Sequence, residues 1–203
     1  MFIDKVRLLL DSVGCIKDDD SICIVILVDE ERHSQLTFVT DETMKNQLSM
    51  RLYKKEDDSR LTKLLPEVMW ESLRGFSDKE DYEMVVDSVG EDGEYHTVLH
   101  NKIFGGKYVI RISDAVLLQE VTGIPLYINL SLVRQQMAPY RPGGNTTSLP
   151  INVMPLEVLE KGLADSIAKE DYHMAQRLKD EINKRKSLNN KGGKTDEGNQ
   201  ILL

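Results

Sequence analysis

Hydrophobic positions in the first half of the chain follow the patterns of β-strands. Ile22–Val28 is an unbroken apolar run, which predicts a strand buried on both faces. Gln35–Val39 is a second strand-like segment, and the polar turn Asp29–His33 separates the two. We therefore expect them to form a hairpin. A three-stranded meander is predicted farther along, from Tyr82–Val89, Tyr95–Ile103 and Lys107–Ile112.

Other segments have the three-to-four-residue spacing of helices. One helix is predicted from Met44, Leu48 and Leu52, and a second from the apolar positions Leu61, Leu65, Val68, Met69 and Leu73. A third is expected to begin at Ser113 as its N-cap and to end at Gly123. The short strand Leu126–Ile128 and a helical piece over Leu130–Met137 follow.

The last quarter of the chain is organised differently. Residues 138–154 begin with a stretch rich in Pro and Gly and are predicted to be a linker. Two amphipathic stripes then predict a helical hairpin over 155–186, and the Asn- and Gly-rich residues 187–203 a disordered tail. The predicted fold class is α+β: a largely antiparallel sheet with packed helices in 1–137, followed by a C-terminal antiparallel helical hairpin.

Composition and charge limit the function classes. The chain has 203 residues, 40% of them hydrophobic, with 26 basic against 34 acidic side chains and a net charge of −8. Residues 156–203 are balanced, so the whole deficit lies in 1–155, which argues against a generic nucleic-acid coat. Two cysteines make no disulfide framework, and no apolar segment has the length of a membrane span or the pattern of a signal peptide. We expect a cytoplasmic protein without membrane association.

One C-terminal segment carries a recognisable pattern. Glu170-Asp171-Tyr172, then Ala175, then Leu178-Lys179-Asp180-Glu181-Ile182 closely resembles the UVR motif of the excision-repair proteins UvrB and UvrC. In that family the motif is an antiparallel helical hairpin that pairs with another protein or with another copy of itself. The resemblance implies a partner-binding role for Tyr172, Ala175, Leu178 and Ile182, and it suggests a homo-oligomer. The alternative is a hairpin that docks on its own domain through the same apolar face.

The larger region resembles a divergent bifunctional nuclease domain, from a bacterial family found also in plants and reported to act on DNA and RNA, often followed by a UVR motif. Ile110–Leu118 and Thr122–Ile128 are similar to the family's strand, Ser-Asp-Ala helix start, helix and following strand. Leu36–Thr40 occupies the place of an earlier family strand. The chain departs from the family at Asp41 and Met44-Lys45, and at Leu61-Thr62-Lys63-Leu64 in place of Leu-Thr-His-Asp.

Cleavage of phosphodiesters with a divalent metal ion needs carboxylates that converge on the ion. The candidates are Asp114, Asp41 and Glu42, with Asp114 as metal ligand and Mg²⁺ or Mn²⁺ as the ion. Each also has a structural explanation, because carboxylates at a helix start interact favourably with the helix dipole. The Asp18–Asp20 cluster suits a solvated turn, and the strand positions of His96 and His100 put them roughly 13 Å apart, too far for one ion.

Basic and aromatic residues of the predicted meander are candidates for nucleic-acid binding. Lys102, Lys107 and Arg111 lie on adjacent predicted strands with Tyr108 nearby. Three further basic residues add to this strip: Arg51, Lys54 and Lys55. The alternative is that these are scattered charges on a solvated surface.

Two function hypotheses result from these patterns. In the first, the protein is a nuclease of the bifunctional type that hydrolyses DNA or RNA with a metal ion held partly by Asp114. In the second, it is a catalytically inactive family member that acts as an interaction or regulatory module through its UVR hairpin. Convergence of Asp114 with other carboxylates favours the first, and exposed apolar surface with isolated acids favours the second.

Overall fold

The computed structural model describes residues 5–16, 19–54, 59–142 and 149–192. The chain divides into two compact units. The first comprises Met1–Val89 and Tyr95–Leu149, and the second comprises Gly90–Glu94 and Pro150–Leu203. The short segment Gly90–Glu94, which connects two strands of the first unit, therefore groups with the C-terminal residues.

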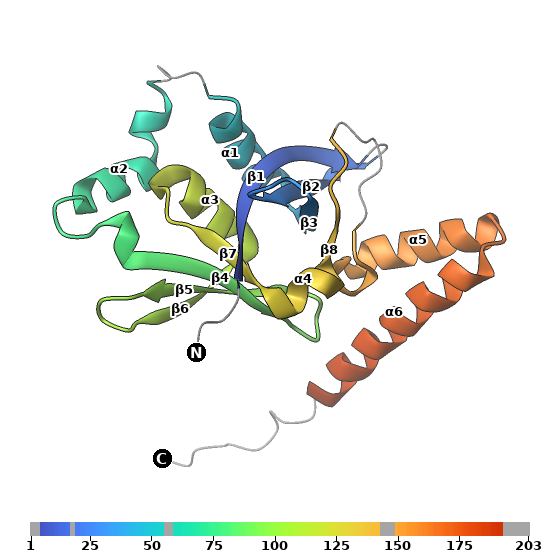
Figure 1. The fold of residues 1–203 in the computed structure, drawn as a ribbon. Coiled ribbons are helices and arrows are strands. Elements are labelled where there is room, and N and C mark those ends of the chain that lie inside the picture. The colour runs from blue at the N-terminus through green and yellow to red at the C-terminus, as the bar shows by residue number, and fades with distance from the viewer. Residues whose placement is uncertain (1–4, 17–18, 55–58, 143–148, 193–203) are drawn as a thin grey trace, which may run out of the picture. The chain divides into compact units, whose positions relative to one another are not determined.

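The first unit is built on one eight-stranded sheet (Figure 1). Its strands are β1 (Lys5–Ile16), β2 (Asp19–Asp29), β3 (Ser34–Thr40), β4 (Tyr82–Val89), β5 (Tyr95–Asn101), β6 (Lys107–Arg111), β7 (Leu126–Asn129) and β8 (Met137–Pro139). Their order across the sheet is β6-β5-β4-β7-β1-β2-β3-β8. Neighbours pair antiparallel except β4 and β7, which are parallel. The fold is thus α+β with a mostly antiparallel sheet, as predicted.

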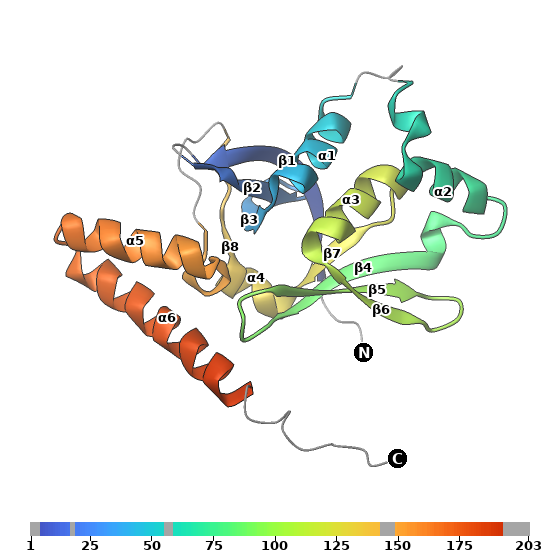
Figure 2. The same ribbon diagram turned by 180° about the vertical axis from the view of Figure 1, so that it is seen from behind.

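Helices cover one face of this sheet and enclose the core. In the described residues the α-helices of this unit are α1 (Glu42–Leu52), α2 (Leu65–Leu73), α3 (Ile112–Thr122) and α4 (Leu130–Gln136). Of these, α1 and α3 lie over the strands (Figures 1 and 2). Apolar side chains without exposed surface fill the space between: Leu8, Val25, Leu27, Leu36, Leu48, Met84, Val86, Val116, Leu126 and Ile128. A one-residue slip of any strand would turn this set to the other face, so the core fixes the register.

The predicted hairpin and meander are confirmed. β2 pairs antiparallel with β3, and β4, β5 and β6 pair in sequence. β2 itself differs from the prediction, because only one of its faces is fully buried. Cys23, Val25 and Leu27 have no exposed surface, whereas Ile24 and Ile26 on the opposite face are half-buried. The continuous apolar run of this strand therefore supplies one core face and one partly covered face.

Strands β1 and β8 are not predicted from the sequence. In β1 the register with β2 shifts between Leu10 and Ser12, and this irregularity interrupts the two-residue alternation that marks a strand. β8 pairs with β3, Gln35 opposite Ala138, at the position where the linker is predicted to begin. It is the short edge strand of the sheet, and Pro139 is compatible with such an edge.

Helix α2 forms within the stretch where the sequence predicts a helix, but Leu61, the first predicted position, lies in a separate 3-10 helix (Leu61–Lys63). The apolar residues of α2 itself are not buried. Its exposed fractions are 69% for Leu65, 45% for Val68, 55% for Met69 and 48% for Leu73. Phe76, just beyond the helix, is 90% exposed. The apolar spacing thus predicted the helix correctly and its burial incorrectly, and the first unit presents an apolar helix surface to solvent.

The second unit contains a short 3-10 helix (Ile151–Val153), α5 (Leu156–Ala168) and α6 (Tyr172–Gly192). Leu159, Leu178 and Ile182 form its buried cluster, with half-buried apolar neighbours at Ile151, Met154, Leu156 and Leu163. The predicted tail begins at 187, but α6 continues to Gly192. Residues 193–203 lie outside the described part of the chain.

The turn between α5 and α6 is tight and capped. Glu170 takes the left-handed conformation with a φ of 60°. The next residue, Asp171, accepts a hydrogen bond from the Met174 backbone N–H at 3.0 Å. This bond satisfies one of the unpaired donors at the start of α6.

Candidate functional site

Asp114, the foremost predicted catalytic residue, lies in the first turn of α3. Strand β6 runs directly into this helix, so Ile112 begins it and Arg111 occupies the N-cap position. Ser113 is buried within the first turn, and the prediction of Ser113 as N-cap is therefore wrong. Asp114 therefore sits two residues deeper in the helix than expected.

The carboxylate of Asp114 is bound by its neighbour Arg111. The guanidinium donates from Nε to Oδ2 at 2.7 Å and from Nη2 to Oδ1 at 3.1 Å. Both carboxylate oxygens therefore face a fixed cation where a metal ion would have to bind. In this arrangement Asp114 does not fit the role of a metal ligand, and the pair is a partly exposed ion pair of the kind that contributes about 0–1 kcal/mol.

The other two predicted carboxylates serve the start of α1. Asp41 is its N-cap and accepts a hydrogen bond from the Met44 backbone N–H at 2.8 Å. Glu42 is exposed in the first turn, where its charge interacts favourably with the helix dipole. Both residues thus have the structural role that the sequence allowed as the alternative.

Within the described residues, no three His, Cys, Asp or Glu side chains lie together in a way that would hold a metal ion. The structure therefore does not bring Asp114, Asp41 and Glu42 into one such group. The side chains of the Asp18–Asp20 cluster lie outside the described part of the chain, as does Lys55.

The predicted basic and aromatic strip is divided between two faces of the sheet. Lys107 and Arg111 are on one face of β6, and Tyr108 is on the other, because side chains alternate along a strand. Lys102 follows β5 in a turn, where its backbone N–H donates to Asp81. Tyr108 is 58% exposed. The four residues thus share a sheet edge, but Tyr108 does not share a face with Lys107 and Arg111.

A different group of basic residues shares the face that carries Lys107 and Arg111. The strand register places His96 beside Arg111 and His100 beside Lys107. Further along the same face, register pairs Arg7 of β1 with Tyr127 of β7, and Lys5 lies 4.2 Å from the Tyr127 ring centroid. Two acidic residues contact this group: Glu83 at 2.6 Å from Lys5 and Glu30 at 3.3 Å from Arg7. Lys5 and Arg7 were missed because β1 was not predicted. Tyr127 lies on a predicted strand, but its role was missed because the sequence does not show that this strand pairs with β1.

The main buried charge in the first unit lies between α1 and α2. Arg51, 2% exposed, donates from Nε and Nη2 to the two carboxylate oxygens of Glu67 at 2.8 and 3.0 Å. Its Nη1 donates to the backbone and side-chain oxygens of Gln47, both at 2.8 Å. The predicted use of Arg51 in nucleic-acid binding is therefore wrong, since its guanidinium is enclosed. Lys54 is exposed.

Glu120 of α3 is a half-buried carboxyl group of the first unit. Its pKa is raised, because burial disfavours the charged form, and nearby Lys54 and Arg51 oppose that rise only in part. A half-buried acid of raised pKa is a common feature of functional sites. The sequence contains no signal for it, since Glu120 is one of many helical acidic residues.

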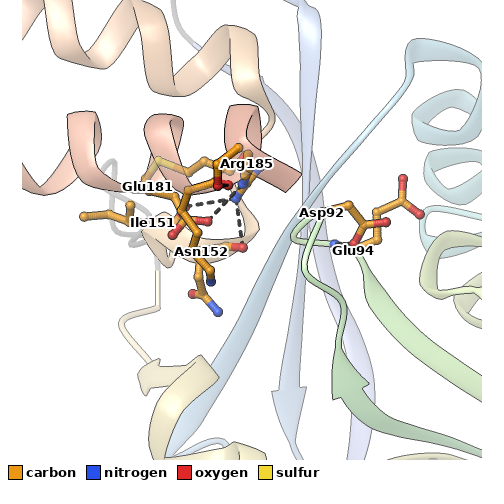
Figure 3. Close-up of polar contacts among 9 residues, drawn as sticks. Asp92, Glu94, Ile151, Asn152, Glu181 and Arg185 are labelled. Carbon is orange, nitrogen blue, oxygen red and sulfur yellow. Dashed lines mark hydrogen bonds and ion pairs between the residues drawn. The ribbon is translucent and has the colours of Figure 1, made fainter. Parts of the chain in front are cut away.

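The second unit is organised around Arg185 of α6, which is 8% exposed (Figure 3). Its guanidinium donates to the backbone carbonyls of Met154 at 2.6 Å and Asn152 at 2.9 Å, and to Glu181 at 2.9 Å. Gly93, with a φ of +88°, comes so close that an added Cβ would lie 2.6 Å from Nη2 of Arg185. One arginine thus joins α6 to the segment that precedes α5, and Gly93 lies close against its guanidinium.

The predicted partner-binding residues are mostly enclosed. Ala175, Leu178 and Ile182 are 7%, 4% and 5% exposed, so they pack within the unit and leave little surface for a partner. Tyr172 alone of the four is on the surface, at 68% exposed. Ile167 and Met174 flank the same turn between α5 and α6, at 54% and 36% exposed. The exposed apolar side chains of α5 and α6 therefore lie at the turn between the two helices, and the apolar face formed by Ala175, Leu178 and Ile182 is enclosed.

In the described residues, none of the helices has the length and apolar character needed to cross a membrane. No protein-family model matches the chain, and no curated protein matches it.

Proposed function

We propose that this protein is an interaction module that self-associates through a UVR-type antiparallel helical hairpin formed by α5 and α6. In this proposal the chain is a divergent, catalytically inactive member of the bifunctional nuclease family and acts in the cytoplasm. The observation that carries the proposal is the exposed apolar group at the end of the hairpin, formed by Ile167, Tyr172 and Met174. We call this group the hairpin tip.

The hairpin tip is exposed although the interior between α5 and α6 is well packed. The buried cluster of Leu159, Leu178 and Ile182 already occupies the space between α5 and α6. The tip residues lie within eight positions of one another, across a turn held by the Asp171 cap. Tyrosine is enriched at the energetic centre of interfaces, and methionine is enriched in interfaces generally. A second copy offers the same tip, so a two-fold contact would bury both.

The test is the association state of the full chain, measured by sedimentation over a range of concentrations. We expect wild type to associate and the double variant Ile167→Ser, Tyr172→Ser to be a monomer. Leu130→Ser is the matched control, because Leu130 is 47% exposed in the first unit, and it should associate like wild type. A wild type that stays monomeric at every concentration would contradict the proposal.

A nucleic-acid function is the second candidate, and one observation favours it. Lys5, Arg7, Lys107 and Arg111 share one face of the sheet with Tyr127. Basic side chains interleaved with an aromatic ring suit a nucleic-acid strand. In this candidate the protein is a nuclease of the bifunctional type that cleaves DNA or RNA with Mg²⁺ or Mn²⁺.

Two measurements test this candidate. Cleavage of single- and double-stranded substrates is assayed with and without Mg²⁺ or Mn²⁺, for wild type and Asp114→Ala. Binding of a labelled oligonucleotide is compared between wild type and Arg7→Ala at several salt concentrations, with exposed Arg177→Ala of α6 as control. Metal-dependent cleavage by wild type would establish the nuclease, and its loss in Asp114→Ala would show that Asp114 takes part. Absence of both cleavage and salt-dependent binding would exclude this candidate and leave the interaction module.

A further inference from the structure

Two cysteines face each other across neighbouring strands. Cys15 of β1 is the register partner of Cys23 of β2, and their Sγ atoms are 3.0 Å apart. Residues directly opposite in an antiparallel pair have Cα atoms about 4.5–5.5 Å apart, whichever type of pair they form. A disulfide requires a Cα separation of about 4.4–6.8 Å. The two backbones are therefore already placed for a disulfide, and only the side chains need to move.

We propose that Cys15 and Cys23 form a redox-active dithiol that closes to an intramolecular disulfide by exchange with an oxidised low-molecular-weight thiol and reopens on reduction. This activity goes beyond the proposed self-association and does not depend on it. The two thiols differ in access, which sets the order of the reaction. Cys15 is partly exposed, whereas Cys23 has no exposed surface.

The surroundings of the pair give each thiol a separate role. Burial, and then the hydrogen bond and charge of Cys15, raise the pKa of Cys23 to about 11. Cys23 therefore keeps its proton and is the natural donor in the contact between the two sulfurs. The Lys45 ammonium of α1 also donates to Cys15 Sγ, at 3.6 Å. Both contacts are made to the sulfur of Cys15, which is also the more accessible of the two thiols, so Cys15 is placed to react first.

The chemistry balances in two exchange steps. Cys15 attacks the disulfide RSSR, which forms Cys15–S–S–R and releases one RSH that carries the proton of Cys15. Cys23 then attacks the sulfur of Cys15, which forms the Cys15–Cys23 disulfide and releases a second RSH with the proton of Cys23. One RSSR is reduced to two RSH, and two protein thiols are oxidised to one disulfide. No metal ion or further oxidant takes part.

The dithiol also lies beside the start of α1. In the β2–β3 ladder Cys23 pairs with Thr40, the residue before the Asp41 cap of that helix. Lys45 is on the first turns of the same helix. A disulfide here would join β1 to β2 next to α1, and it would convert the thiol group that Lys45 contacts.

The experiment uses the full chain, first reduced and then incubated without oxygen in oxidised glutathione. Acid-quenched samples are analysed by intact mass and peptide mapping. We expect wild type to lose two hydrogen atoms, to retain no glutathione, and to yield a linked Cys15–Cys23 peptide that a reductant separates. Cys23→Ala should stop with glutathione attached to Cys15. Cys15→Ala should react with glutathione more slowly than wild type by a factor of about ten or more, because the remaining thiol is buried.

Lys45→Gln tests the role of the ammonium, with Lys179→Gln, an exposed lysine of α6, as the matched control. We expect several-fold slower modification of Cys15 in the first variant and the wild-type rate in the second. The proposal is overturned if wild type keeps both thiols under conditions that oxidise the unfolded chain. Glutathione that stays on Cys15 in wild type, or a disulfide between two chains, overturns it equally. Because the mapping of wild type is decisive by itself, a variant that fails to fold leaves the test valid.

Discussion

Glu67 of α2 binds both nitrogens on one side of the Arg51 guanidinium, while that guanidinium is almost completely enclosed by the protein. This pair connects two helices whose apolar contact is small, because the apolar residues of α2 face solvent. Much of the contact between α1 and α2 therefore depends on a charged pair. A buried ion pair adds little compared with an apolar one, but removal of one partner leaves a buried charge and is costly.

Glu67→Ala is therefore expected to lower the free energy of unfolding by about 3–5 kcal/mol, the usual cost of an unpaired buried charge. Glu71→Ala, on the same helix, is the control, because its pair with Arg74 is exposed and should change stability by less than about 1 kcal/mol. Urea unfolding of the two variants provides the comparison. Equal stabilities would show that Arg51 finds other partners.

Asp29, 8% exposed at the end of β2, makes stability depend on pH. Burial alone would raise the pKa of this carboxyl, but hydrogen bonds from the Ser34 hydroxyl and from the His33 and Ser34 backbone N–H groups lower it below its ordinary value. A lowered folded-state pKa stabilises the protein above the ordinary pKa of 3.8, and this stabilisation is lost as pH falls through the folded value.

Asp29→Asn should thus be destabilising by about 1–3 kcal/mol at pH near 7, where a charged acceptor is replaced by an amide. The difference from wild type should shrink as unfolding is measured at pH values below the ordinary pKa. Glu31→Gln is the control, because Glu31 is exposed in the same turn. A constant difference at all pH values would mean that the charge of Asp29 is not the source of the effect.

Glu120 should change the pH dependence of stability in the direction opposite to that of Asp29. Its raised folded-state pKa means that its contribution is most favourable below its ordinary pKa and is lost as pH rises through the folded value. We expect Glu120→Gln to be more stable than wild type at neutral pH and to lose that advantage in acid. Thermal unfolding of wild type and Glu120→Gln, followed from acid to neutral pH, measures this difference in stability. A destabilised variant at neutral pH would indicate that the carboxylate has a partner worth more than its burial.

Arg185→Lys should destabilise the second unit although the charge is kept. Lysine lacks the planar fork that reaches Met154, Asn152 and Glu181 together, and each buried carbonyl left without a donor costs about 1–3 kcal/mol. The helical circular dichroism signal should be lost at a lower temperature in Arg185→Lys than in wild type. Arg177→Lys, at an exposed position of α6, should leave the curve unchanged.

The sequence predicts most of the strands and helices, because their apolar residues either form an unbroken run, as in Ile22–Val28, or repeat with the period of their element, as Met44 and Leu48 do. β1 is hidden because its bulge at Leu10–Ser12 interrupts that period. Burial is harder to predict than the element itself. The spacing of apolar residues is similar in α2 and in α6, yet only α6 is covered along that face.

The site residues depend on contacts that local sequence does not contain. Arg51 and Arg185 look like ordinary surface arginines in the sequence, but Glu67 and the Met154 carbonyl, both distant in the chain, enclose them. Asp114 is predicted as a ligand or as a helix-start carboxylate, and the approach of Arg111 gives it a third role. Cys15 and Cys23 look like separate small hydrophobic residues until the β1–β2 register places them together.

The position of β1 between β7 and β2 has a consequence for synthesis of the chain. Leu8 pairs with Leu126, so β1 acquires its second neighbour only after a long further stretch of the chain has been made. The two half-sheets, β1-β2-β3 and β4-β5-β6, each have local pairings and can form early. Pairing of β7 with β1 and β4 is the late, long-range event. Until it occurs, one edge of β1 is open to pairing with other nascent chains.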